Sequence, residues 1–443
     1  MLEDYRIEGR GAAEIAASVE RGLGSGALEP GDALPPLREL AVRLGVNPNT
    51  VAAAYRSLRD RGVIETAGRR GSRIRRRPAT TPREELRVRV PEHARDLSTG
   101  NPDPALLPPL AGALAGAARR AAAAPTLYGA PAVSAELARE ARHRLTGDGV
   151  PDGPVAVTSG SLDAVERVLA AHLRPGDTVA VEDPGWGSLL DLVPAMGLRV
   201  APVALDDEGP LPGAVDAALA AGARALILTA RAQNPTGAAV SAARAAALRS
   251  VLSAHPDTLL LEDDHGHGIV EQPLHPLSGT VARWILVRST AKAYGPDLRL
   301  AVLTGDALTL DRVQGRQRLG PGWVSHLLQD AVAHLWAEEG ALRTTAARSY
   351  RERREALLTA LAEHGVEGRG GTGMNVWVPV PDETGAVARL LQAGWAAAPG
   401  ARFRVSSEPA IRLTVSPLAH REIPRVARAV AEALRPDEAR RYD

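Results

Sequence analysis

The chain has 443 residues, and it contains no cysteine, a single phenylalanine and no long apolar run. Disulfide bonds, metal sites built on thiolates and thiol catalysis are therefore excluded. No run approaches the roughly 20 apolar residues that a membrane-spanning helix needs. Residues 1–10 also lack the apolar segment of a secretory signal. A cytoplasmic location and no membrane partner are therefore expected.

Lysine is almost absent as well, because 52 of the 53 basic residues are arginine. Arginine can replace lysine as a surface charge, but its guanidinium stays protonated and forms no Schiff base with a carbonyl. A lysine amine can be tuned into a nucleophile. The one position that keeps lysine, Lys292, is therefore a candidate for covalent carbonyl chemistry. A stray surface lysine is the alternative.

What the chain does contain is divided unevenly along its length. Apolar residues make up 45% and charged residues 24%, which is typical of a globular protein, and the length predicts about two to four domains. Residues 1–90 hold 17 arginines and 12 acidic residues, so they carry +5, although the whole chain carries only +1. A basic front end on a mildly acidic body indicates a nucleic-acid-binding module joined to another domain.

The first 75 residues have the pattern of a winged helix-turn-helix. Apolar residues at helical spacing predict three helices, over 15–23, 37–44 and 51–58. Glycines follow these helices, and Asn47 is a suitable N-cap for the third. Two short strands, 63–66 and 72–75, flank a Gly-Arg-Arg-Gly turn at 68–71.

The start of the third helix and the wing are both suited to DNA. A recognition helix offers its first N–H groups and polar side chains to the major groove, and a basic hairpin can straddle the neighbouring backbone. The candidate residues from these two places are Asn47, Asn49, Thr50, Arg69 and Arg70. A purely structural three-helix module is the alternative.

Several segments of this region closely resemble the GntR-type DNA-binding domain: 34–41 (LPPLRELA), 44–46 (LGV), 49–51 (NTV) and 54–58. The resemblance implies that Arg38, Asn49, Thr50 and the wing around Gly71 contact double-stranded DNA. The family usually has Ser-Arg before its Asn-Thr, whereas this chain has Asn47-Pro48. The operator sequence therefore cannot be carried over from the family.

Residues 76–95 contain three prolines and many charges without a sustained apolar period, which is typical of a flexible linker. Beyond them, short apolar runs alternate with amphipathic stretches such as 162–173 and 242–254. The predicted strands are 155–158, 178–181, 225–229, 259–261, 284–287 and 300–303. This alternation predicts an α/β domain over 96–443 with a mostly parallel, covered sheet.

Four polar clusters follow predicted strands, and ligands of such sheets collect at the carboxyl ends of the strands. The clusters are Ser159-Gly160-Ser161, the NPTG segment 234–237, the EDDH segment 262–265, and the STAK segment 289–292 with Arg299. Together they supply a phosphate cradle, an amide, a carboxylate and an amine. Each cluster alone has an ordinary structural explanation, such as a turn.

This combination resembles the fold-type I enzymes that use pyridoxal 5′-phosphate (PLP), the aspartate aminotransferase-like class, over roughly 96–436. The resemblance implies a large lobe to about 320 and a smaller C-terminal α/β lobe at about 340–436. It implies that Lys292 forms the internal aldimine, that Asp263 pairs with the pyridine nitrogen and that Asn234 binds the phenolic oxygen. The residues implied to bind the phosphate are Gly160, Ser161, Ser289 and Arg299.

Three further roles follow from the same resemblance. Trp186 occupies the position of the aromatic residue that stacks on the cofactor ring. Tyr128 would reach the phosphate in the neighbouring subunit, which implies a homodimer. Arg412 matches the arginine that clamps a substrate carboxylate, and without the resemblance an ordinary ion pair would explain it.

The chain departs from the aminotransferase pattern in three places. His265 stands where the family has a tyrosine that donates to the cofactor, so the reactivity of the aldimine differs even though an imidazole can also donate. Residues 229–233 lack the Pro-Ser-His often found before Asn-Pro-Thr-Gly, and Ala291 replaces a hydroxyl residue. None of these departures abolishes the predicted cofactor site.

A GntR-type module, a linker and an aminotransferase-like domain in this order resemble the MocR subfamily of bacterial transcriptional regulators. The resemblance implies that an amino acid or amine effector displaces Lys292 from PLP and thereby changes DNA binding. Two alternatives stay open. One is a working aminotransferase with an accessory DNA-binding module, and the other is a DNA-binding protein that uses the fold only as a dimerisation scaffold.

Overall fold

The computed structural model of the chain describes residues 5–24, 27–29, 31–60, 63–66, 71–74, 83, 90–338 and 340–435. The chain divides into two compact units. The first comprises residues 1–85 with the short segments 173–179 and 188–200, and the second comprises the remainder. No helix in the described residues is long and apolar enough to cross a membrane.

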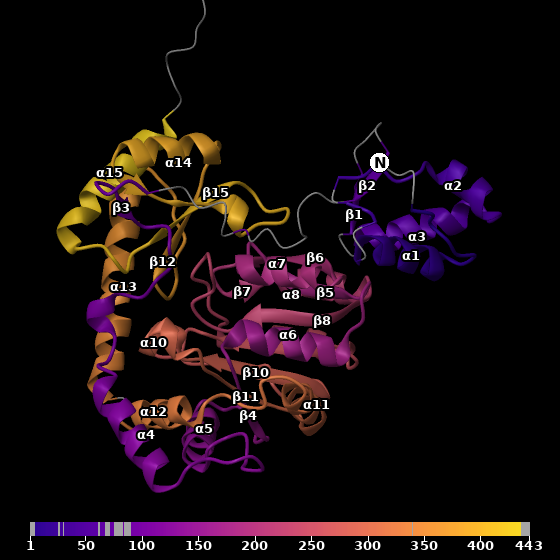
Figure 1. Ribbon diagram of the computed structural model, residues 1–443. Coiled ribbons are helices and arrows are strands. Elements are labelled where there is room, and N and C mark those ends of the chain that lie inside the picture. Colours follow the sequence, from indigo (N-terminus) through magenta and orange to yellow (C-terminus); the bar gives the residue numbers. More distant parts are fainter. Residues whose placement is uncertain are drawn as a thin grey trace, which may run out of the picture. The chain divides into compact units, whose positions relative to one another are not determined.

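The N-terminal residues form the expected helices and hairpin (Figure 1). The elements are α1 (Ala12–Gly24), α2 (Leu37–Leu44), α3 (Pro48–Asp60), β1 (Ile64–Thr66) and β2 (Ser72–Ile74). The two strands pair antiparallel, and helices α1 and α2 both pack on α3. Buried apolar side chains at helical spacing hold them together, among them Ile15, Val19, Leu40, Val51 and Leu58.

Two local signals place the recognition helix. Gly45 adopts a left-handed φ of 67° and ends α2, a conformation that glycine reaches without strain. The side chain of Asn47 then accepts a hydrogen bond from the backbone N–H of Asn49 at 2.8 Å, so the predicted N-cap of α3 is confirmed. Arg69 and Arg70 lie outside the described residues, as does most of the predicted linker 76–95.

Within the described residues, the largest sheet has eight strands in the order β4-β11-β10-β9-β8-β5-β6-β7. Its strands are β4 (Val155–Thr158), β5 (Thr178–Asp183), β6 (Arg199–Asp206), β7 (Gly209–Pro210), β8 (Ala223–Thr229), β9 (Leu259–Asp264), β10 (Arg283–Ser289) and β11 (Ala301–Gly305). Strands β8, β9 and β10 are parallel, whereas β11 runs antiparallel to β10 and β4. Nearly every residue of the central strands is buried, so the sheet is covered on both faces.

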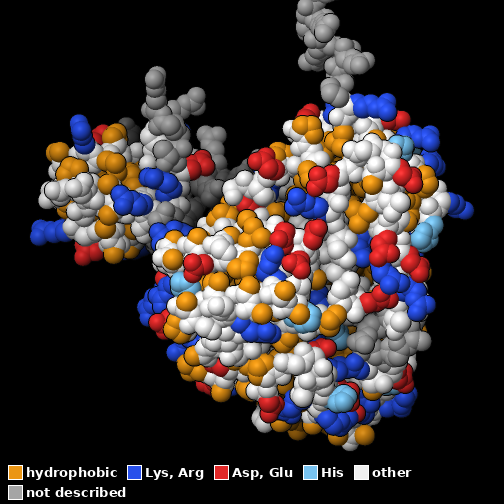
Figure 2. Space-filling model, turned by 180° about the vertical axis from the view of Figure 1, so that it is seen from behind, with side chains coloured by type: hydrophobic (Ala, Val, Ile, Leu, Met, Phe, Trp, Pro, Cys, Tyr) orange, Lys and Arg blue, Asp and Glu red, His pale blue; other side chains and the backbone are white. Residues whose placement is uncertain are grey.

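The helices that alternate with the strands of this sheet follow the α/β order that the sequence predicts. They are α4 (Ala111–Ala123), α5 (Ala135–Gly147), α6 (Ser161–His172), α7 (Gly187–Ala195), α8 (Pro212–Ala220), α9 (Ala242–Ala254), α10 (Ala291–Tyr294), α11 (Ala307–Arg318) and α12 (His326–Ala337). Helix α6 packs on α11, and α4 packs on α12. Acidic and basic side chains are interspersed on the face drawn in Figure 2.

The long helix α13 (Gly340–Glu363) leads into a smaller lobe with its own apolar core (Figure 1). Antiparallel strands β12 (Asn375–Pro379), β15 (Ala410–Thr414) and β14 (Ala398–Pro399) form its sheet, and α14 (Glu383–Gln392) and α15 (Ile423–Leu434) pack together beside it. Strand β3 (Arg95–Asp96) pairs in parallel with β13 (Trp395–Ala396), and Leu97 is buried in the same core. The segment that follows the predicted linker is therefore part of the small lobe.

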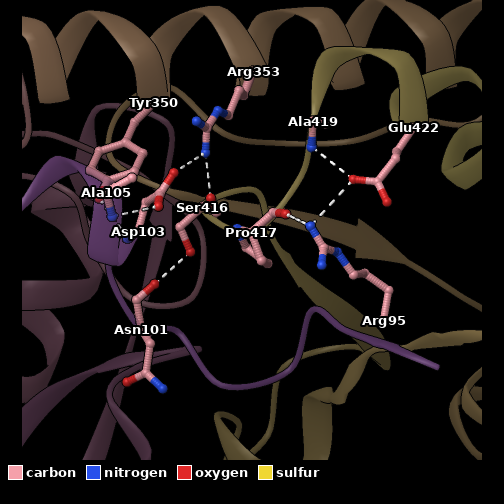
Figure 3. A network of polar contacts seen from close by, with 10 residues as sticks. All are labelled: Arg95, Asn101, Asp103, Ala105, Tyr350, Arg353, Ser416, Pro417, Ala419 and Glu422. Carbon is pink, nitrogen blue, oxygen red and sulfur yellow. Dashed lines mark hydrogen bonds and ion pairs between the residues drawn. The ribbon is translucent and has the colours of Figure 1, made fainter. Parts of the chain in front are cut away.

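Polar contacts fix this segment along its length (Figure 3). Asp103 accepts a hydrogen bond from Arg353 of α13 at 2.8 Å and donates its backbone N–H to the hydroxyl of Tyr350 at 2.9 Å. The hydroxyl of Ser416 donates to the carbonyl of Asn101. Arg95 contacts Glu422 at 3.5 Å. Residues 95–103, called the entry segment below, are thus held by α13 and by the loop before α15.

Candidate functional site

The polar clusters predicted from the sequence meet at one edge of the sheet. Thr229 of β8 and Val287 of β10 both pair with Asp263 of β9, so these parallel strands end together. At the neighbouring antiparallel strand, Ala301 pairs with Ser289 on one side and with Thr158 on the other. The loops after β4, β8, β9 and β10 therefore surround one site, as the sequence predicts.

Lys292 lies in the short helix α10, directly after β10. Its ammonium nitrogen donates a hydrogen bond to the carbonyl oxygen of Gly100 at 2.7 Å. Gly100 belongs to the entry segment, so the single lysine is held by the part of the chain that directly follows the predicted linker. Sequence reasoning missed this contact because a backbone carbonyl carries no residue signature.

The loop after β4 forms a small cradle around a cationic side chain. The guanidinium of Arg299 donates to the carbonyl of Ser159 at 2.8 Å, and a Cβ added at Gly160 would lie 2.9 Å from the same Nη2 atom. Gly160 has a φ of 97°, which favours glycine. The hydroxyl of Ser161, at the start of α6, is buried without a hydrogen-bond partner among the described residues. A helix N-terminus, a guanidinium and an available hydroxyl suit a phosphate.

Asp263 is the last residue but one of β9, and only one of its two carboxylate oxygens has a hydrogen-bond partner in the described structure. Its Oδ2 is 2.8 Å from Nδ1 of His265, whereas its buried Oδ1 has no hydrogen-bond partner in the described structure. Burial disfavours the charged imidazole, but the hydrogen bond and charge of Asp263 outweigh burial and raise the pKa of His265. The available Oδ1 is the kind of buried acceptor that needs a donor from a ligand.

Asn234 and Arg412 come together on the small-lobe side of the site. Arg412 of β15 donates to Oδ1 of Asn234 at 2.9 Å and to the carbonyl of Ser98 at 2.6 Å. Its guanidinium carbon stands 4.6 Å from the centre of the Phe403 ring, a cation–π contact. Arg402, which the sequence did not single out, approaches the same carbonyl of Ser98 at 3.4 Å.

The loop after β5 brings Trp186 to the same edge, half-buried. Asp183, three residues earlier, accepts backbone hydrogen bonds from Val405, Ser406 and Ser407 of the small lobe at 2.8–3.0 Å. Burial acts to raise the pKa of Asp183, but these hydrogen bonds prevail and hold it below its ordinary value. Asp183 thus ties the Trp186 loop to the loop after Phe403. Stacking by Trp186 on a cofactor stays a prediction.

Tyr128 and Ser289 complete the predicted set. Ser289 ends β10, and its hydroxyl accepts from the N–H of Ala291 at 3.2 Å. The Tyr128 side chain is 93% exposed and contacts Trp323 edge to face at 5.7 Å. A tyrosine so exposed in one chain is available to a second chain, but its predicted reach into a neighbouring subunit stays a prediction.

A second polar network lies behind the same strand end, and no sequence motif indicated it. Asp264 is fully buried and accepts hydrogen bonds from Arg231 and Arg288, each at 2.9 Å. Burial opposes its charge, but the two guanidinium groups prevail and hold the pKa of Asp264 far below its usual range. Arg288 also pairs with Asp148 at 2.6 Å.

Two buried glutamates flank these carboxylates and titrate near neutrality. Burial raises the pKa of Glu182, on β5, to about 7 even though the N–H of Thr229 and the amide of Gln233 donate to it. Burial likewise raises the pKa of Glu262, on β9, to about 7, against hydrogen bonds from Leu277 and Ser278.

Most of the predicted DNA-binding residues that the structure describes are exposed, and their contact with DNA stays a prediction. Arg38 on α2 and Asn47 and Asn49 at the start of α3 are exposed, and Thr50 is half-buried. Gly71 in the wing has a φ of 79°, which glycine adopts without strain, and an added Cβ would meet no atom within 4 Å. In the same described residues, no cluster of three or more His, Asp or Glu side chains is placed to hold a metal ion.

The residues at the sheet edge fit PLP on structural grounds. The available Oδ1 of Asp263 matches a protonated pyridine nitrogen, and the Ser161 hydroxyl in the Arg299 cradle matches a phosphate. Lys292 supplies the amine at the same edge of the sheet, in the helix after β10. The donor set therefore agrees with an aldehyde cofactor that carries a phosphate and a basic ring nitrogen.

The chain matches two protein families. Residues 12–74 match the family described as bacterial regulatory proteins, gntR family, and residues 93–430 match Aminotransferase class I and II. Among solved structures, the aspartate aminotransferase of Thermus thermophilus with maleate is 27% identical, has a TM-score of 0.68 and covers 77% of this chain and 92% of its own. The α-aminoadipate aminotransferase LysN of the same species, at 24% identity and a TM-score of 0.70, covers 81% and 95% and shows the same fold.

Two transcriptional regulators also match the chain, one of them over nearly its whole length. The vitamin B6 salvage pathway transcriptional repressor PtsJ of Salmonella typhimurium is 41% identical over 433 residues, which cover 97% of this chain and 99% of that protein. The pyridoxine biosynthesis transcriptional regulator PdxR of Corynebacterium glutamicum is 30% identical and covers 79% and 78%. The chain is thus a transcriptional regulator with a GntR-type DNA-binding domain and an aminotransferase-like domain. It belongs to the MocR subfamily of GntR-type regulators.

Proposed function

We propose that the chain is a PLP-dependent transcriptional regulator that senses an amino acid or amine effector through cofactor bound at Lys292. The observation that carries the proposal is the pairing of a single lysine with available acceptors at one sheet edge. Lys292 follows β10, and in the described residues Oδ1 of Asp263 near the end of β9 and the hydroxyl of Ser161 at the start of α6 have no hydrogen-bond partner.

The residues of the chain divide the work of holding PLP. Lys292 is the covalent anchor, Oδ1 of Asp263 accepts from the pyridine nitrogen and Asn234 donates to the phenolic oxygen. The phosphate lies against Gly160, Ser161, Ser289 and Arg299, and Trp186 covers the ring. When bound, PLP supplies an electrophilic carbon that can exchange the lysine amine for the amine of an effector.

Cofactor and effector binding together require two changes at the entry segment. Lys292 already gives up the carbonyl of Gly100 when it joins the cofactor and is released from the cofactor when the effector displaces it, and Arg412 turns its guanidinium from the carbonyl of Ser98 to the effector carboxylate. For these changes to alter transcription, the effector must bind one DNA-binding state of the protein more tightly than another.

The proposal includes a division of the chain and its partners. Residues 1–75 bind double-stranded operator DNA through Arg38, Asn47, Asn49, Thr50 and the wing at 69–71. Residues 76–95 connect this module to the PLP-binding region, 96–443. Tyr128 reaches the cofactor phosphate of a second copy in a cytoplasmic homodimer.

The covalent anchor is tested by comparing the wild type with Lys292→Arg, which keeps the charge but not the nucleophilic amine. Both proteins are incubated with PLP, reduced with borohydride and precipitated in acid. The wild type should retain about one label per chain, and Lys292→Arg should retain none. Equal labelling of the two proteins would overturn both the regulator proposal and the aminotransferase alternative.

Regulation is tested by DNA binding of the same preparations. The names of PtsJ and PdxR make promoters of vitamin B6 salvage and biosynthesis genes the first probes, with PLP alone and then PLP with each of the common amino acids as ligands. The expected result is a DNA affinity that changes at least tenfold with one of these ligands. Sustained conversion of an amino donor and a 2-oxo acid, with unchanged DNA affinity, would instead favour a working aminotransferase.

A further inference from the structure

His265 stands at a position where the aminotransferase class has a tyrosine, but its ring is committed in another direction. Nδ1 lies 2.8 Å from Oδ2 of Asp263, and Nε2 lies 2.8 Å from the carbonyl oxygen of Ala232. Both ring nitrogens therefore have protein partners. The side chain is only 17% exposed.

The backbone around Ala232 explains why the ring points this way. Ala232 has a φ of 56°, a left-handed conformation that residues other than glycine rarely adopt. Its N–H donates to the hydroxyl of Thr372 at 2.9 Å, and its carbonyl accepts from His265. A Cβ added at Gly373 would lie 2.7 Å from the Cβ of Ala232. The small lobe thus holds Ala232 in the conformation that orients His265.

These contacts determine where the protons of the pair lie. A carbonyl oxygen only accepts, so Nε2 must carry a hydrogen. The remaining proton lies between Nδ1 and Oδ2 of Asp263, and the other carboxylate oxygen, Oδ1, has no partner in the described part of the chain. The carboxylate is therefore fixed in rotation by a contact on one side only.

We propose that His265 is a positioning residue that holds Asp263 in the orientation required by the pyridine nitrogen of PLP, and that it does not contact the phenolic oxygen. This inference rests on the proposed function, because it concerns the same cofactor. Asn234, held by Arg412, is then the donor to the phenolic oxygen. The histidine therefore takes over a different task from the tyrosine that it replaces.

The charged groups facing His265 come from three strands or helices. Asp263 of β9 favours the imidazolium, and so does Glu182 of β5 when ionised, whereas Lys292 of α10 opposes it. Because the pKa of His265 is raised, the imidazolium persists to a higher pH than in a free histidine and then loses its proton. The charge next to Asp263 changes at that point, so the absorbance of bound PLP should report this step.

Three variants of His265, which differ in the group near the position of Nδ1, test whether this residue positions Asp263. His265→Asn puts an amide donor near the position of Nδ1, His265→Phe removes both nitrogens, and His265→Tyr restores the phenol of the aminotransferase class. We measure PLP dissociation constants of the full-length proteins by absorbance, across pH. His255→Asn is the matched control, since His255 also pairs with an aspartate, Asp216, at 2.8 Å.

The expected result is rescue by asparagine. His265→Phe and His265→Tyr should bind PLP about tenfold or more weakly, because the carboxylate of Asp263 loses the hydrogen bond that fixes its rotation. His265→Asn should stay within about threefold of the wild type and lose one spectral titration step. His255→Asn should match the wild type in affinity and titration.

Two results would overturn the inference: recovery of wild-type affinity and spectrum by tyrosine but not asparagine, or wild-type binding by all three His265 variants. If the variants do not fold, a structure of the wild type with PLP decides, because Nδ1 of His265 then lies within hydrogen-bond distance of either Asp263 or the phenolic oxygen. Failure of the wild type to bind PLP would remove the proposed function itself. Recovery by tyrosine in a protein that responds to PLP would remove this inference alone.

Discussion

Asp263 and Asp264 are neighbours on β9 but face opposite sides of the sheet, and their surroundings differ completely. Asp264 is fully buried between Arg231 and Arg288, and both of its oxygens accept hydrogen bonds. Asp263 has one oxygen on His265 and one buried oxygen without a partner in the described structure. We call the first side the closed face and the second the open face. The open face has an unsatisfied acceptor that a ligand can complete.

One of these carboxylates holds the fold, and the other is available to a ligand. Burying a charge is costly unless partners surround it, so the contacts of Asp264 compensate for its own burial. The hydrogen bond that Asp263 lacks is available to a bound group. Stability should therefore depend on the closed face, and ligand binding on the open face.

The largest expected effect is on the closed face. Asp264→Asn leaves two buried guanidinium groups without their shared counter-charge, so the free energy of unfolding should fall by about 3–5 kcal/mol. Urea unfolding followed by circular dichroism measures this loss. Asp216→Asn, at an exposed pair with His255, should change stability by less than about 1 kcal/mol. A loss at Asp264 as small as at Asp216 would remove the distinction between the faces.

The second effect concerns Glu262, which lies on the closed face and has a pKa raised by burial from 4.5 to about 7. The folded state keeps its proton up to about pH 7, whereas the unfolded state loses it near 4.5, so stability falls as the pH rises between these values. A shift of this size corresponds to roughly 3 kcal/mol. Glu262→Gln should remove the contribution of Glu262 to the fall of stability with rising pH, while the contribution of Glu182 remains.

Unfolding free energies of the wild type and Glu262→Gln at about pH 5 and about pH 8 test this expectation. The variant should gain stability relative to the wild type at the higher pH. Parallel pH profiles of the two proteins would mean that Glu262 is not protonated in the folded state.

The third effect contrasts directly with the first. Asp263→Asn makes the hydrogen bond to His265 a neutral one, and its Oδ1 has no partner in the described structure, so the free energy of unfolding should fall by about 1–2 kcal/mol, less than for Asp264→Asn. Affinity for PLP, measured by absorbance titration, should fall at least tenfold. A stability loss comparable to that of Asp264→Asn would show that both aspartates hold the fold.

The smallest effect is expected at Ser161. Ser161→Ala removes a buried hydroxyl without a described partner, so stability should change by less than about 0.5 kcal/mol while PLP affinity falls about fivefold. Ser278→Ala is the matched control, because its hydroxyl donates to Glu262 and its loss should lower stability without changing PLP affinity. A stability loss in Ser161→Ala together with weaker PLP binding in Ser278→Ala would contradict the distinction between the open and the closed face.

Sequence patterns predicted much of the fold because their causes are local. Three examples are the N-cap at Asn47, the glycine after α2 and the apolar strand runs. Each determines the structure of residues only a few positions away. The antiparallel direction of β11 departs from the mostly parallel sheet that the sequence predicts, and its cause is the short connection to β10. Only residues 290–300 separate it from β10, too few for the usual crossover, and the strand runs antiparallel.

In the candidate site too, sequence patterns predicted the features with local causes and missed those that depend on distant residues. The residues after each strand end were identifiable, since parallel strands gather their carboxyl ends at one edge. The partners of Asp264 come from residues 24 and 33 positions away, and the carbonyls of Ser98 and Gly100 have no side-chain signature. The direction of His265 depends on the left-handed conformation of Ala232, which an alanine gives no reason to expect. Long-range packing decided each of these features.

The entry segment limits how such a protein can be assembled from parts. Strand β3 pairs with β13, and the carbonyls of Ser98 and Gly100 hold Arg412 and Lys292. A gene fusion that exchanged the DNA-binding module would preserve these contacts only if its junction fell before Arg95. A junction after Gly100 would replace part of the ligand site along with the module. Recombination can therefore exchange the DNA-binding module only at a junction before Arg95, although the main sheet does not begin until β4, at Val155.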